Sequence, residues 1–199
     1  MLSGAPEALL AAFGIVFLAE LGDKTQLMVL AFAARYRVLP VLIGVVVASA
    51  LVMGASVLLG AWLGAVIDLT LLQLAGALVF LVSAAWTVLV PDDDPEEAQA
   101  VAQSAPPSRL VLRSVAIVVV TFLLAELGDK SMLAAMALAI QAEPAATWLG
   151  ATLGLVTVSL IAVAVGRQLG PRLPRKWLRF VSAAAFAAFG LLLLVSALA

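Results

Sequence analysis

The heptapeptide Leu-Ala-Glu-Leu-Gly-Asp-Lys occurs twice, at residues 18–24 and 124–130, each time inside a long apolar segment. The two copies hold six ionisable side chains: Glu20, Asp23, Lys24, Glu126, Asp129 and Lys130. At the centre of a bilayer each would cost about 2.5–3.5 kcal/mol, before mutual pairing lowers that cost. Ionisable groups at such a depth typically mark an ion pathway, so a role in moving ions is the default interpretation.

The composition indicates an integral membrane protein. The chain is 65% hydrophobic and only 12% charged, whereas soluble domains are roughly 45–50% apolar and about 25% charged. One membrane-spanning helix needs about 20 apolar residues, so we expect 199 residues to form six spans in an all-α fold. The predicted helices are 7–34, 41–66, 69–90, 110–141, 145–169 and 176–198.

The repeat extends beyond the motif at a constant offset of 106 residues. Gly44 matches Gly150 and Phe80 matches Phe186, which indicates a duplicated three-helix unit. Because three is odd, the second unit enters the membrane from the opposite side, and the two units form an inverted repeat. We expect a first repeat at 1–90, an acidic cytoplasmic linker at 91–109 and a second repeat at 110–199, with both motifs near the bilayer midplane.

Lysine and arginine outside the motifs predict the orientation. All nine lie in the first, third and fifth connections: Arg35, Arg37, Arg109, Arg113, Arg167, Arg172, Arg175, Lys176 and Arg179. Basic residues favour the cytoplasmic side, so these connections are expected there and both termini outside. The run 172–179, which includes Trp177, reads as an interfacial anchor. The acidic linker is interpreted as a solvated, flexible tether. The alternative is that its carboxylates attract cations on the cytosolic side.

The motif offers oxygen ligands for a cation. Within one helix, Glu20 and Asp23 would share a face, and a cation between them could reach both carboxylates. Thr25 and Gln26 add neutral oxygens, and Lys24 offsets part of the negative charge. Gly22 permits either close helix contact or a local break that exposes backbone carbonyls.

The net charge of the motifs and the lack of Cys and His limit which ions the site can bind. Four carboxylates and two ammonium groups leave a formal charge of −2 in the two motifs, which one divalent cation or two protons would neutralise. Metal binding requires deprotonated carboxylates, so protons and metal compete for the site, as in an antiporter. With no Cys and no His in the chain, oxygen ligation favours Ca²⁺, Mn²⁺ or Mg²⁺ over Zn²⁺ and Cu⁺.

The paired E-x-G-D-K-[ST] signature, one copy in each half, resembles uncharacterised protein family 0016, the GDT-type cation/proton exchangers. The resemblance covers nearly the whole chain. It implies that the cation is bound by Glu20, Asp23, Glu126 and Asp129, with help from Thr25, Gln26 and Ser131. Lys24 and Lys130 would then balance charge. Met132 stands where the family pattern has Gln, which suggests an asymmetric site.

The leading hypothesis is a transporter that exports Mn²⁺, or alternatively Ca²⁺, from the cytosol in exchange for protons. We expect it in the bacterial inner (plasma) membrane, with no cofactor, no enzyme activity and no nucleic-acid partner; a homodimer is left open. The alternative is an efflux carrier for amino acids or similar small zwitterions, although the carboxylate excess argues against it. A bundle locked by internal salt bridges and a membrane scaffold are further alternatives.

Overall fold

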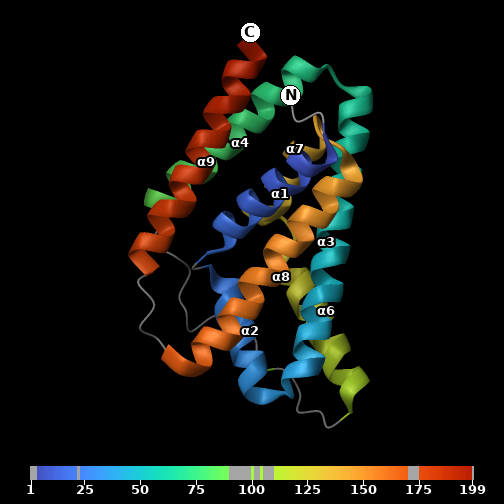
Figure 1. Ribbon diagram of the computed structural model, residues 1–199, viewed down its shortest axis with the longest axis vertical. Coiled ribbons are helices and arrows are strands. Elements are labelled where there is room, and N and C mark those ends of the chain that lie inside the picture. Colours follow the sequence, from blue (N-terminus) through green and yellow to red (C-terminus); the bar gives the residue numbers. More distant parts are fainter. Residues whose placement is uncertain are drawn as a thin grey trace.

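The computed structural model is all-helical over the residues that it describes, which are 4–21, 23–89, 100, 104, 110–169 and 175–198. Figure 1 shows long helices packed side by side into an elongated bundle, with both termini at the same end. The helices are α1 (Ala5–Glu20), α2 (Lys24–Arg35), α3 (Val38–Val66), α4 (Leu69–Leu89), α6 (Val111–Glu126), α7 (Lys130–Ala139), α8 (Pro144–Leu169) and α9 (Arg175–Leu198).

Two predicted helices are broken within the repeated motif. The predicted helix 7–34 is the pair α1 and α2, and the predicted helix 110–141 is the pair α6 and α7; each pair is bent by 75°. In the second copy, Gly128 adopts a φ of +80°, a left-handed conformation that glycine adopts without a steric penalty. Asp129 then begins α7 as its N-cap, and its carboxylate accepts from the Ser131 N–H at 3.5 Å.

The break corrects one expectation. Glu20 is the last residue of α1, and Asp23 is the extended N-cap of α2, so the two carboxylates do not share one helical face. The remaining predicted helices begin and end close to α3, α4, α8 and α9. Polar residues start two of them: Asp68 accepts from the Leu71 N–H at 3.1 Å, and Glu143 accepts from two N–H groups at the start of α8, as N-caps do.

Length and composition identify membrane spans among the described residues. Three helices, α3, α4 and α8, are long and apolar enough to cross a membrane, and the number rises to five if each bent pair is one span. The sixth predicted span appears as the shorter apolar helix segment Ala183–Leu198. The linker 91–109 lies almost wholly outside the described residues, as do the side chains of 172–179.

The two halves have the same order of helices. Each helix of the second half begins 106 residues after its counterpart, since α1, α2, α3 and α4 begin at Ala5, Lys24, Val38 and Leu69, and α6, α7, α8 and α9 at Val111, Lys130, Pro144 and Arg175. The halves interlock, because α1 packs against α8 while α6 packs against α3, and α4 packs against α9. The matched residues Phe80 and Phe186 touch, with ring centroids 5.8 Å apart. Such exchanged contacts are those of a two-fold interface.

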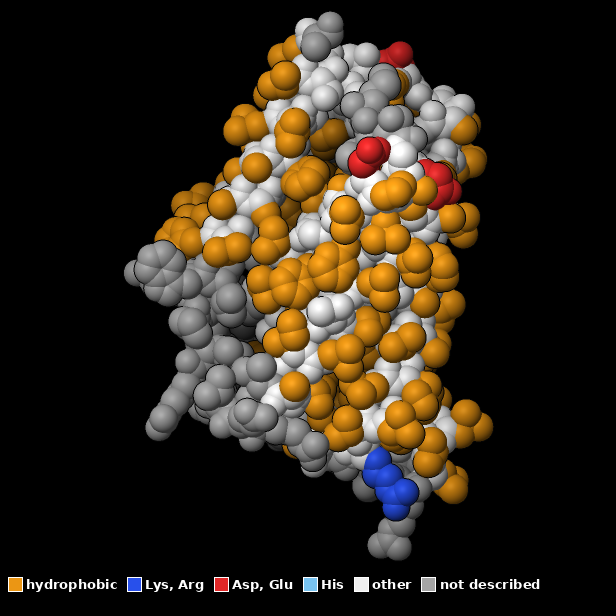
Figure 2. All heavy atoms as spheres, in the orientation of Figure 1, with side chains coloured by type: hydrophobic (Ala, Val, Ile, Leu, Met, Phe, Trp, Pro, Cys, Tyr) orange, Lys and Arg blue, Asp and Glu red, His pale blue; other side chains and the backbone are white. Residues whose placement is uncertain are grey.

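The outer surface is apolar along the length of the bundle. Figure 2 shows hydrophobic side chains covering most of the face in view, with acidic side chains toward the end that holds the termini and basic ones at the opposite end. Large apolar side chains such as Leu58, Trp62 and Leu112 are 60% or more exposed. A soluble protein would aggregate through such a surface, so this one suits contact with lipid.

Glycines allow the closest helix contacts, as at Gly60 and Gly64 in α3. A Cβ at Gly60 would overlap the backbone carbonyl of Met136 in α7, and a Cβ at Gly64 would lie 3.1 Å from the carbonyl oxygen of Ile140. Helix α3 therefore packs directly on the backbone of the half-helix α7. This contact fixes α7 close to its neighbour in the bundle.

The Gly60 contact gives a stability prediction. Gly60→Ala should lower the thermal unfolding midpoint of the purified protein, because overpacking typically costs about 1–3 kcal/mol. Gly14→Ala is the matched control, since a Cβ there meets nothing within 4 Å, and its better helix propensity should leave the midpoint unchanged or raise it. Equal midpoints for the two variants would contradict the close packing of α3 on α7.

Candidate cation site

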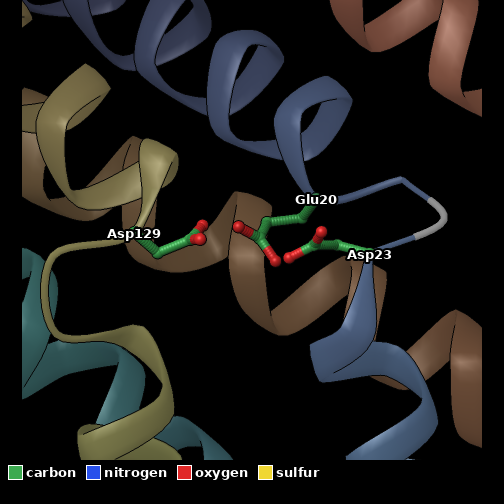
Figure 3. Close-up of side chains that lie close together, drawn as sticks. All are labelled: Glu20, Asp23 and Asp129. Atoms are coloured by element: carbon green, nitrogen blue, oxygen red, sulfur yellow. The ribbon is translucent and has the colours of Figure 1, made fainter. Parts of the chain in front are cut away.

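Three carboxylates from both halves converge at the helix breaks. One carboxylate oxygen each from Glu20, Asp23 and Asp129 can be chosen so that all three lie within 4.8 Å of one another. Figure 3 shows Glu20 at the end of α1, with Asp23 on one side and Asp129, from the opposite half, on the other. This is a spacing at which a single cation can be held by several oxygens.

The two glutamates of the motifs are the most deeply buried charged residues of the described chain. Glu20 is 0% exposed and Glu126 is 1% exposed. Each accepts one hydrogen bond from the hydroxyl five residues later, from Thr25 at 2.8 Å and from Ser131 at 3.2 Å. The hydroxyls thus occupy one oxygen, Oε2, of each carboxylate.

The second oxygen of each glutamate has no hydrogen-bond partner among the described residues. These atoms are Glu20 Oε1 and Glu126 Oε1, both buried. An unpartnered buried polar atom is costly, and more so when it is charged. A cation or a proton at the cluster would remove that cost, so the unpartnered oxygens fit a site that exchanges one for the other.

Glu126 stands slightly apart from the other carboxylates. It is not a member of the group whose oxygens lie within 4.8 Å of one another. It interacts electrostatically with Glu20 and with Asp129, so its charge still acts on the cluster. The structure therefore brings together three of the four predicted carboxylates and keeps the fourth within electrostatic range.

An ion pair joins the two halves at the cluster. Lys130 Nζ lies 2.9 Å from Asp23 Oδ1, and the side chains are 21% and 15% exposed. The sequence indicates that the lysines balance charge, but it does not predict this pair, because the partners are 107 residues apart. The side chain of Lys24 lies outside the described residues.

The two copies differ where Gln26 is replaced by Met132. Gln26 donates from Nε2 to the backbone carbonyl of Glu20 at 2.9 Å, and so ties the first turn of α2 to the end of α1. Met132 cannot donate; its sulfur instead accepts from the Gly128 N–H at 3.3 Å. The first break is therefore fastened by an amide and the second by a weaker thioether contact.

The partial charges at the helix ends contribute to the electrostatic field at the site. Helices α1 and α6 end at Glu20 and Glu126, and α2 and α7 begin directly after Asp23 and Asp129. The carbonyl end of a helix carries a partial negative charge that favours cations, and the N–H end favours carboxylates. Broken helices of this kind form ion sites in many secondary transporters.

Comparisons with known proteins identify the family of this chain. A family model described as "Divalent cation/proton antiporter GDT1" matches residues 8–94 and 114–199. The chain is 34% identical over 179 residues to a Vibrio cholerae serotype O1 protein described as "Putative manganese exporter", covering 86% of this chain and 82% of that protein. No solved structure matches the chain. Each of the two matched segments includes one copy of the motif. The chain belongs to the GDT1 family of divalent cation/proton antiporters.

Proposed function

We propose that this membrane transporter exports Mn²⁺, with Ca²⁺ as a second substrate, from the cytosol in exchange for protons. The observation that carries the proposal is the convergence of the Glu20, Asp23 and Asp129 carboxylates, drawn from both halves of an apolar bundle. The relative described as a manganese exporter favours Mn²⁺ as the substrate. Oxygen ligands alone suit either ion.

In this proposal the cluster binds metal and protons in turn. Glu20, Asp23 and Asp129 are direct ligands, and Glu126 adds negative charge and can join them when the halves move. The hydroxyls of Thr25 and Ser131 orient the two glutamates, to which they donate, and Gln26 holds the first helix break. Because protonated carboxylates bind metal poorly, protons entering from outside release the metal.

Lys130 serves as an internal cation while the metal is absent. Its ammonium group lies 2.9 Å from an oxygen of Asp23, so it neutralises a carboxylate that the metal needs. An incoming divalent ion must displace it, and the ammonium returns when the ion leaves. Displacement of this kind keeps the empty site from holding its full negative charge inside the bundle.

The alternating access that we propose rests on the exchanged packing of the two halves. The pairs α1 with α8 and α6 with α3 are related by exchange of the repeats, which supports an inverted repeat of six spans with the cluster near the midplane. The acidic and basic ends of the surface favour both termini outside and the first, third and fifth connections in the cytoplasm. Rocking of one half on the other would open the cluster to each side in turn.

Flux measurements test the carboxylates. In liposomes with an imposed pH gradient, the wild type should move Mn²⁺. Loss of an outer-shell partner alone typically lowers metal affinity by about 10–100-fold. Because Glu20 and Asp129 are proposed as direct ligands, Glu20→Gln and Asp129→Asn should each lower the affinity for Mn²⁺ by at least that factor. Glu7→Gln is the matched control, because Glu7 is exposed at the start of α1. Undiminished Mn²⁺ flux in both site variants would refute the proposal.

A kinetic test separates the role of Lys130 from simple structural support. Lys130→Gln should lower the KM for Mn²⁺, because nothing competes for Asp23. It should also lower the maximal rate, because the proton-loaded carrier then returns with a negative charge that the ammonium group no longer compensates. Lys130→Arg keeps the charge and should retain most of the maximal rate. A raised KM for Lys130→Gln would show that the lysine supports the site rather than competing with the metal.

Single cysteines test the orientation, since the chain has none of its own. A maleimide that cannot cross the membrane should label Ala5→Cys and Ala65→Cys on intact cells, because both positions are exposed and lie toward the predicted outer side. Arg37→Cys should react only after the membrane is opened. Labelling of Arg37→Cys on intact cells would reverse or refute the topology.

A further inference from the structure

A cavity lies apart from the cation cluster, between α1, α4, α7 and α9. Its volume is about 320 Å³, at the lower end of the roughly 300–1,000 Å³ typical of ligand cavities. None of the clustered carboxylates lines it. The residues that do so are Ala11, Phe80, Ala137, Leu138, Gln141, Phe189, Leu192, Leu193 and Ser196.

The cavity lining is mostly apolar, and its polar part is small. Phe80 and Phe189, whose rings lie 6.0 Å apart, form an aromatic wall. The polar lining comes from Gln141 and Ser196, near the carboxyl ends of α7 and α9. Gln141 also accepts a hydrogen bond from Gln73 at 2.9 Å, which fixes its amide in place. The lining thus matches a molecule with a long apolar part and a polar end.

Water and metal ions are poor occupants. A buried water needs two to four polar partners, and these are offered only by Gln141 and Ser196 at the polar end, not by the aromatic and alkyl part of the lining. A dehydrated cation needs several oxygen ligands, and the lining holds no carboxylate. Leu192 lines the cavity and is also 61% exposed, so the cavity is continuous with the apolar surface that contacts lipid.

We propose that this cavity binds one acyl chain of a bilayer phospholipid. The chain would lie against Phe80 and Phe189, and the ester region of the lipid would reach Gln141 and Ser196. The occupant would fill the space between α1 and α7, the half-helices that adjoin the cation cluster, and brace both against α9. This proposal concerns lipid binding and does not depend on which ion is transported.

The test counts phospholipids that the purified protein retains. Wild-type protein, reconstituted with a single phosphatidylethanolamine and returned to mild detergent, should keep one phospholipid by native mass spectrometry. Ala11→Phe places a ring in the cavity and should abolish this retention, while Ala11→Leu should reduce it. Ala184→Phe is the matched control, since Ala184 is exposed on α9 and outside the cavity lining, and it should retain the lipid as the wild type does.

Each outcome decides the proposal. Loss of the lipid in Ala11→Phe with retention in Ala184→Phe supports it, and the graded Ala11→Leu variant serves if the larger side chain prevents folding. Equal retention by all variants places the lipid on the outer surface and overturns the proposal. Retention of detergent but no phospholipid by the wild type overturns it as well.

Discussion

The burial of two glutamates in an apolar bundle is the constraint that organises this structure. Glu20 and Glu126 are almost fully enclosed, although a charged carboxylate is costly there. The surrounding features reduce that cost: a hydroxyl donor for each glutamate, a helix break beside each one, and an ammonium group at the cluster. An oxygen of each glutamate is still unpartnered within the described chain, which suits a site that takes up a cation.

Neither half of the chain can build the cluster alone. Glu20 and Asp23 come from the first half, and Asp129 and Lys130 come from the second. The geometry of the site therefore depends on how the halves sit against each other. In the proposed mechanism, a movement of one half relative to the other would change the distances between the ligands directly and so couple ion binding to conformational change.

The helix breaks were only partly foreseen from the sequence. A glycine followed by an aspartate is a combined stop and start signal, because glycine ends helices in the left-handed conformation and aspartate caps them. Gly128 and Asp129 behave in this way. The long apolar segments nevertheless predicted one continuous helix across each motif, and this prediction wrongly placed Glu20 and Asp23 on one helical face. Hydropathy averages over many residues and does not register a two-residue interruption.

The sequence alone determined the all-helical fold, the bounds of α3, α4, α8 and α9 to within a few residues, the duplication at an offset of 106 residues and the residue types at the site, because these follow from composition and local order. The tertiary structure decided which carboxylates meet and that Lys130 pairs with Asp23 across 107 residues. It also decided that Glu126 stands apart from the other three carboxylates. Periodicity relates only neighbours within a few helical turns, whereas these contacts depend on how two distant half-helices pack against each other.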